Sequence, residues 1–156
     1  MGKIDFERIV TAQAVEAAHL ARTRDDAAAV VATAIEAAMT RCSDTVPIAE
    51  MLAWGAKELA ARAVVADPEA EPDAILMVEA EMTGESVADL AARIIINAKD
   101  HRSLVSLLTG VRRKALAAIA AAADAEAIAG VLKDAIDRIA AAQGAAQCKE
   151  PPGQRS

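Results

Sequence analysis

Residues 87–122 read VADLAARIIINAKDHRSLVSLLTGVRRKALAAIAAA, and this stretch decides the fold. Its larger apolar residues recur at alternating steps of three and four, which is the spacing of one face of an α-helix. The repeat continues over several heptads and therefore predicts one long helix with an apolar seam. The seam consists of Val87, Leu90, Ile94, Ala98, His101, Val105, Leu108, Val111, Ala115 and Ile119. Gly110 lies on its path and costs about 1 kcal/mol against Ala, so a bend or break there stays open.

A shorter helix follows the long one. Asp124 is a candidate N-cap, and Gly144 is the predicted end. Its apolar stripe contains Ile128, Val131, Leu132, Ala135, Ile136 and Ile139. The short link predicts an antiparallel hairpin with the second half of the long helix. Because the final helix is much shorter, the front half of the long helix must pack against the second and third helices described below or against another subunit.

Three helices are predicted upstream. Residues 11–41 contain no Gly or Pro and predict a long first helix. Pro47 fits the start of a second helix, whose apolar side chains at helical spacing are Ile48, Met51, Leu52, Leu59 and Val64. A third helix, about 72–82, ends at Gly84. Ser86 and Asp89 then resemble a capping box for the long helix.

The fold class is therefore predicted to be all-α, with about five helices and a C-terminal antiparallel hairpin. Residues 1–10 are a lead-in, 11–142 form one helical domain and 143–156 form a disordered tail, which is polar and contains two prolines. The chain is 54% hydrophobic but only 1% aromatic, and much of the apolar content is alanine, the best helix former. The unmatched helix lengths predict a coiled-coil-like assembly, either a homo-oligomer or a groove for a partner helix.

Charge and cysteine content exclude some functions. The net charge of −6 disfavours general affinity for nucleic acid or an anionic membrane, which needs clustered Lys and Arg. No apolar run reaches the roughly 18 residues that span a bilayer, and the start lacks the apolar core of a secretory signal. Cys42 and Cys148 are interpreted as separate thiols, and a cytosolic origin is the default.

No motif for catalysis, cofactor or metal binding is present. His19 and His101 lie far apart in the sequence, and neither has a ligand-like neighbour pattern. The few aromatic residues leave little to build the walls of a catalytic pocket. The sequence therefore predicts a protein that is not an enzyme and needs no cofactor or metal, with His101 as a packed or interface histidine.

A basic run lies at 101–114, where Arg102, Arg112, Arg113 and Lys114 occur without an acid. One interpretation is that these cations pair with acids on the final helix, such as Asp134 and Asp137. The other is that they bind phosphate or an acidic partner.

The only tryptophan, Trp54, lies in residues 51–64, MLAWGAKELAARAV, and is followed by Gly55. In an alanine-rich chain one indole can bury about 150–250 Å². We interpret Trp54 as a packing anchor, with a hot spot for a partner as the alternative. As a buried anchor, its replacement by Ala is expected to cost about 3–5 kcal/mol.

Residues 46–140 resemble small tail-associated proteins of double-stranded DNA bacteriophages. The matching residues are Pro47, Trp54, Lys57, Thr83, Gly84, Glu85, Gly110, Arg112, Arg113 and Lys114. The resemblance implies a tail structural protein or a tail fibre assembly factor. It implies tail or tail-fibre proteins as partners, and a location in the virion or in the host cytoplasm during assembly.

Helix periodicity, the basic run and the resemblance together define a hypothetical partner interface. It consists of Trp54, His101, Val105, Leu108, Arg112, Arg113 and Lys114. The alternative function is a helical regulatory or nucleic-acid-binding protein that uses the 101–114 stretch.

Overall fold

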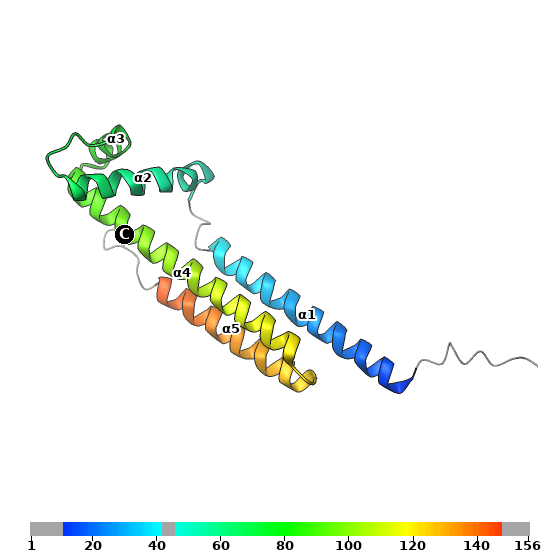
Figure 1. Cartoon of the computed structure of the whole chain (residues 1–156). Helices are drawn as coiled ribbons and strands as arrows, with labels where there is room; N and C mark the ends of the chain where they lie inside the picture. The colour runs from blue at the N-terminus through cyan, green and yellow to red at the C-terminus, as the bar shows by residue number, and fades with distance from the viewer. Residues whose placement is uncertain (1–10, 42–45, 148–156) are drawn as a thin grey trace, which may run out of the picture. The chain divides into compact units, whose positions relative to one another are not determined.

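The computed structural model describes residues 11–41 and 46–147, with the side chains of 145–147 left out of the description. Within these ranges the chain forms five helices and no strand, which confirms the all-α prediction (Figure 1). The helices are α1 (Ala12–Arg41), α2 (Ile48–Ala66), α3 (Ala74–Thr83), α4 (Val87–Ala121) and α5 (Ala125–Gln147). The prediction of separate thiols at Cys42 and Cys148 lies outside the described residues.

Local capping chemistry sets several helix ends. The Asp73 carboxylate accepts the Ile75 N–H at 2.9 Å and starts α3, and Gly84 ends α3 in the left-handed conformation with φ 73°. The Asp89 N–H donates to Ser86 Oγ at 3.0 Å, which confirms Ser86 as the cap of α4. Asp89 does not complete a capping box, because its carboxylate instead accepts the Ser86 hydroxyl at 2.6 Å.

The predicted ends of the last helix are half right. Asp124 caps α5 as expected, since its carboxylate accepts the Ala127 N–H at 2.8 Å. The predicted stop at Gly144 is wrong, because α5 continues to Gln147. Glycine only weakens a helix unless it adopts a positive φ, and Gly84 is the only described glycine that does so. The predicted disordered tail thus loses 143–147, and 148–156 lie outside the described residues.

The described chain divides into two compact units, where the sequence predicted a single domain from 11 to 142. The terminal unit contains residues 11–38 and 108–147, and the central unit contains 39–41 and 46–107. A helix of 35 residues, at about 1.5 Å rise per residue, is about 50 Å long. Small alanine-rich cores cover only part of such a length, so the two halves of α4 belong to different cores.

The central unit is formed by α2, α3 and the first part of α4. Its core consists of Ala60, Ala61, Leu76, Ala80, Leu90 and Ala91, with Val64, Ile75, Val87, Ile94 and Ile95 packed against it. This arrangement confirms the prediction that upstream helices cover the front half of the long helix. Four of the six core residues are alanines, so the helix backbones lie close together.

The terminal unit is formed by most of α1, the last part of α4 and α5, which runs back alongside α4 (Figure 1). Its core combines residues of all three helices, namely Ala27, Val31, Ile35, Ala38, Leu108, Val111, Ala115, Ile119, Ala122, Ile128, Ala135, Ile139 and Ala142. The Arg24 guanidinium donates to the Ala122 carbonyl at 2.6 Å, just beyond the end of α4. The first helix therefore packs against the C-terminal hairpin, a question that the sequence left open.

α4 is uninterrupted at Gly110. Its predicted seam is buried at Leu90 and again at Leu108, Val111, Ala115 and Ile119. Between these segments, Ala98 and Val105 are only half-buried and His101 is exposed. The heptad pattern therefore predicted the helix and both of its packed segments, but the middle of the seam is not covered.

Candidate functional site

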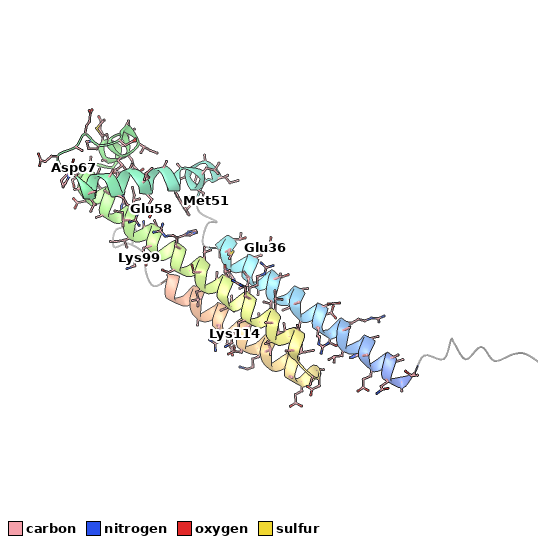
Figure 2. The ribbon with its side chains drawn as sticks, in the orientation of Figure 1. Glu36, Met51, Glu58, Asp67, Lys99 and Lys114 are labelled. Carbon is pink, nitrogen blue, oxygen red and sulfur yellow. The ribbon has the colours of Figure 1, made fainter. Side chains whose placement is uncertain are left out.

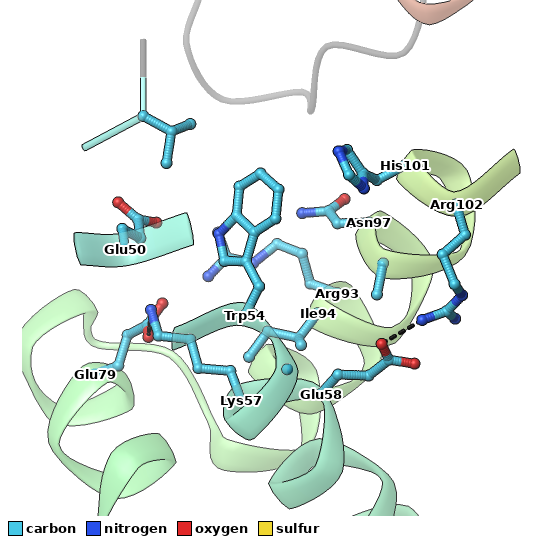
Figure 3. Close-up of a pocket in the computed structure, with 13 residues that line it drawn as sticks. Glu50, Trp54, Lys57, Glu58, Glu79, Arg93, Ile94, Asn97, His101 and Arg102 are labelled. Carbon is cyan, nitrogen blue, oxygen red and sulfur yellow. Dashed lines mark hydrogen bonds and ion pairs between the residues drawn. The ribbon is translucent and has the colours of Figure 1, made fainter. Parts of the chain in front are cut away.

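A groove of about 420 Å³ opens on the central unit between α2 and α4. Trp54 of α2 and His101 of α4 form its aromatic part, with their ring centroids 5.1 Å apart and their planes at 75° (Figure 3). This edge-to-face arrangement is a favoured geometry for two rings. Trp54 is half-buried and does not belong to the core cluster, so it is not a core residue, but its ring contact with His101 joins α2 to α4. The indole instead forms one wall of an open site.

The wall of the groove opposite Trp54 is formed by residues of α4 at helical spacing. Ile94, Ala98 and His101 lie at i, i+4 and i+7 on α4 and all line the groove. From α2, Trp54 and Glu58 follow the same one-turn spacing. Three residues that the sequence placed on the seam of α4, namely Ile94, Ala98 and His101, therefore face this groove where the core ends.

Glu58 joins α2 to α4 through charge. Its carboxylate accepts from Arg62, 2.7 Å away on the same helix, and from Arg102 of α4 (Figure 3). The hydrogen bond from Arg102, followed by that from Arg62, lowers the pKa of Glu58 below its ordinary value of 4.5. Only 17% of the Glu58 side chain is exposed, but 52% of the Arg102 side chain is, so the pair lies at the edge of the groove.

Further ion pairs surround the groove. Lys57 lies 2.6 Å from Glu79 of α3, and Arg93 lies 2.5 Å from Glu85. Among the described residues, Glu50 is the carboxylate of the lining that forms no ion pair. The cations of the groove are thus largely held by neighbouring carboxylates, and its open face presents the aromatic pair.

The residues predicted as one interface are divided between the two units. Trp54 and His101 meet in the groove, and Val105 is half-buried on the central part of α4. Leu108 has no exposed surface, so it packs in the terminal unit and cannot contact a partner. Arg112, Arg113 and Lys114 are exposed and also belong to the terminal unit.

The basic run is divided in the same way. Arg102 pairs with Glu58 in the central unit. The expected pairing of the other cations with α5 is borne out only as a charge interaction of Lys114 with Asp134, because Asp134 and Asp137 form their ion pairs within their own helix. Asp134 binds Arg138 at 2.8 Å, and Asp137 binds Lys133 at 2.7 Å. The hydrogen bond from Arg138 is the main cause that lowers the pKa of Asp134, and the charge of Lys114 adds to it.

Sequence reasoning missed an exposed apolar row on α2. Ile48, Leu52 and Leu59, expected to pack at helical spacing, are 72%, 81% and 73% exposed. Gly55 lies between them on the same face, at i+7 from Ile48. The packed face of α2 uses Ala60 and Ala61 instead, because close approach of the helices favours small side chains. We call the surface formed by Ile48, Leu52, Gly55 and Leu59 the outer row.

α3 exposes a second apolar pair. Val78 and Met82, one helical turn apart, are 61% and 81% exposed, whereas Leu76 and Ala80 of the same helix are buried. Ile96 and Leu107 of α4 are also exposed, so the central unit leaves apolar side chains uncovered on all three of its helices. Uncovered apolar side chains in such rows mark surfaces that contact other proteins more often than single exposed residues do.

The described residues contain neither a metal-ligand cluster nor a membrane-spanning helix. Within 11–41 and 46–147, no group of three or more His, Cys, Asp or Glu side chains is placed to hold a metal ion. Over the same residues, none of the helices has the length and hydropathy of a membrane span.

Comparison of the chain with protein-family models, with curated proteins and with solved structures gives no match.

Proposed function

We propose that this protein is not an enzyme and acts through helix–helix contacts with another protein, using the outer row of α2. The observation that carries the proposal is the exposure of Ile48, Leu52 and Leu59 on a helix whose opposite face is already packed. Such a row matches the apolar spacing by which helices recognise one another. The groove beside the row supports the proposal, since most of its charged groups are engaged in ion pairs.

The proposed setting is the tail of a double-stranded DNA bacteriophage, where the chain acts as a structural component or as an assembly factor. The support is the resemblance carried by Pro47, Trp54, Lys57 and the 83–85 and 110–114 segments. Two of these residues line the groove, namely Trp54 and Lys57.

Mass spectrometry of purified virions, together with affinity purification of the tagged chain from cells during phage assembly, tests this function. A fixed stoichiometry in virions indicates a structural component. Recovery with tail or tail-fibre proteins in cells, but absence from virions, indicates an assembly factor. Absence from virions and no tail protein in the purified fraction would contradict the proposal.

The alternative, nucleic-acid binding through the 101–114 stretch, is favoured by one observation. Arg112 and Arg113 are exposed, and neither forms an ion pair within the described ranges. A band-shift assay at low and high salt tests it, with Arg112→Glu/Arg113→Glu as the matched variant. Salt-dependent binding that the double variant loses would support the alternative, and no binding at low salt would remove it.

A further inference from the structure

The negative charge of the chain is concentrated in the central unit. Residues 46–107 contain eleven Asp and Glu against five Lys and Arg, a net charge of −6. The described part of the terminal unit, 11–38 and 108–147, contains eight acids against seven cations, a net charge of −1. The field around α2 and α3 is therefore strongly negative, and it attracts positively charged partners.

The asymmetry is sharpest beyond Arg62, which follows the outer row by about one turn and is paired with Glu58. From 63 to 92 the sequence contains eight acids and no Lys or Arg. Four of these acids lie in the connection between α2 and α3, at Asp67, Glu69, Glu71 and Asp73, and all four are exposed. Figure 2 labels Asp67 where α2 ends. The last turn of α2 also lacks a basic residue, so the partial negative charge of its carbonyl end is not compensated within the helix.

The outer row itself can accommodate a second helix at close range. A Cβ added at Gly55 would meet no atom within 4 Å, so a partner backbone can approach there. Ile48, Leu52 and Leu59 would flank this point of approach with side chains that are at least 72% exposed. Packing of ridges into grooves between two helices needs such a series of apolar contacts over about three turns.

We infer that the outer row of α2 docks a basic amphipathic helix of another protein, with Lys or Arg at the end that lies over residues 67–73. This inference rests on the proposed function and adds the chemistry of the partner. The apolar face of the partner helix covers Ile48, Leu52 and Leu59. Its cations face the exposed carboxylates and the carbonyl end of α2.

A second copy of this chain is disfavoured as the occupant. Association through this face would bring two copies of residues 46–107, each of net charge −6, together, and like charges repel on association. The predicted homo-oligomer, if formed, would therefore use another surface.

Fluorescence anisotropy with labelled synthetic helices tests the inference on the full chain. The probe is an amphipathic peptide of about 18 residues with Leu at i, i+4, i+7 and i+11 and Lys at its polar positions. The control peptide has Glu in place of every Lys. We expect binding of the Lys peptide that weakens as salt increases, and binding at least about tenfold weaker for the Glu peptide.

Matched variants distinguish the contribution of the outer row to peptide binding from the contribution of the acidic residues. Leu52→Ser/Leu59→Ser should weaken binding of the Lys peptide about tenfold or more, whereas Val78→Ser/Met82→Ser on α3 should leave it unchanged. Glu69→Gln/Glu71→Gln should reduce both the affinity and its dependence on salt. All of these side chains are exposed, so circular dichroism and thermal unfolding should match the parent.

Three results would overturn the inference. These are equal binding of the Glu peptide, unchanged binding after Leu52→Ser/Leu59→Ser, and self-association that this double variant abolishes in light scattering. The virion and purification experiments test the proposed function, and their outcome does not depend on the outcome of the peptide-binding assay. A tail partner lost on Leu52→Ser/Leu59→Ser without preference for the Lys peptide would leave the proposed function intact. Selective peptide binding without any tail partner would leave the docking chemistry intact.

Discussion

At the scale of single residues, Trp54 shows that the position of a residue in the fold, and not its type alone, decides whether it is buried in the core. An indole in an alanine-rich chain is expected to be a core residue, because it offers the largest apolar area. Here it is half-buried and contacts His101 edge to face at the opening of a groove. Alanines fill the adjacent core in its place.

Replacing Trp54 with Ala should therefore cost less than the about 3–5 kcal/mol of a fully buried tryptophan. Urea unfolding followed by circular dichroism measures this cost. A double-mutant cycle with His101→Ala should give a coupling energy of about 0.5–1.5 kcal/mol for the ring pair. A cost in the full range of a buried tryptophan, or zero coupling, would contradict this placement.

Glu58 should make stability depend on acid pH. Its pKa is lowered in the folded state by Arg102 and Arg62, so its contribution is fully present above the ordinary value of 4.5 and is lost as pH falls through the folded pKa. Thermal unfolding of the parent and of Glu58→Gln from about pH 3 to pH 7 tests this. The difference in melting temperature should be largest near neutral pH and shrink toward pH 3. A difference that does not change with pH would mean that the ion pairs do not stabilise the fold.

At the scale of elements, the helix ends follow from local chemistry and the packed faces do not. The sequence predicts Gly84 as the end of α3, and Gly84 has the expected left-handed conformation with φ 73°. Gly144 also follows a helical apolar pattern in the sequence, but α5 continues beyond it to Gln147. On α2, Ile48, Leu52 and Leu59 face outward. Ala60 and Ala61 face inward with Val64 packed beside them, which a hydrophobic pattern cannot predict.

Two glycine substitutions should change the free energy of unfolding in opposite directions. Gly84→Ala should destabilise the protein by about 1–2 kcal/mol, because an L-residue is strained at φ 73°. Gly110→Ala should stabilise it by about 0.5–1 kcal/mol, because a Cβ there meets no atom within 4 Å inside a continuous helix. Chemical denaturation of both variants measures the two effects, and a stabilised Gly84→Ala would refute the assigned cap.

At the scale of the whole molecule, α4 contributes to two separate cores. Leu90 belongs to the central unit and Leu108 to the terminal unit, and neither is exposed. The sequence predicted that one partner helix could not cover the whole of α4. It did not predict that the covering helices form two distinct compact units.

The same substitution on the same helix should therefore have different local effects. Leu90→Ala and Leu108→Ala should each cost about 2–5 kcal/mol in the unit that loses the contact. Hydrogen exchange should report reduced protection in α2 and α3 for Leu90→Ala, and in α1 and α5 for Leu108→Ala. Equal loss of protection in all helices for both variants would mean that the two units unfold as one.

The sequence by itself determined the helices, because periodicity, capping residues and alanine content act over a few residues. It also predicted that α2 and α3 were available to cover the front of α4. Only the tertiary structure decided which face of each helix is buried. In an alanine-rich chain, a close helix contact favours small residues, so Ala60 and Ala61 lie inside while Leu52 and Leu59 remain outside. The same contact brings Trp54, Glu58, His101 and Arg102 together, because residues distant in sequence meet only when two helices pack.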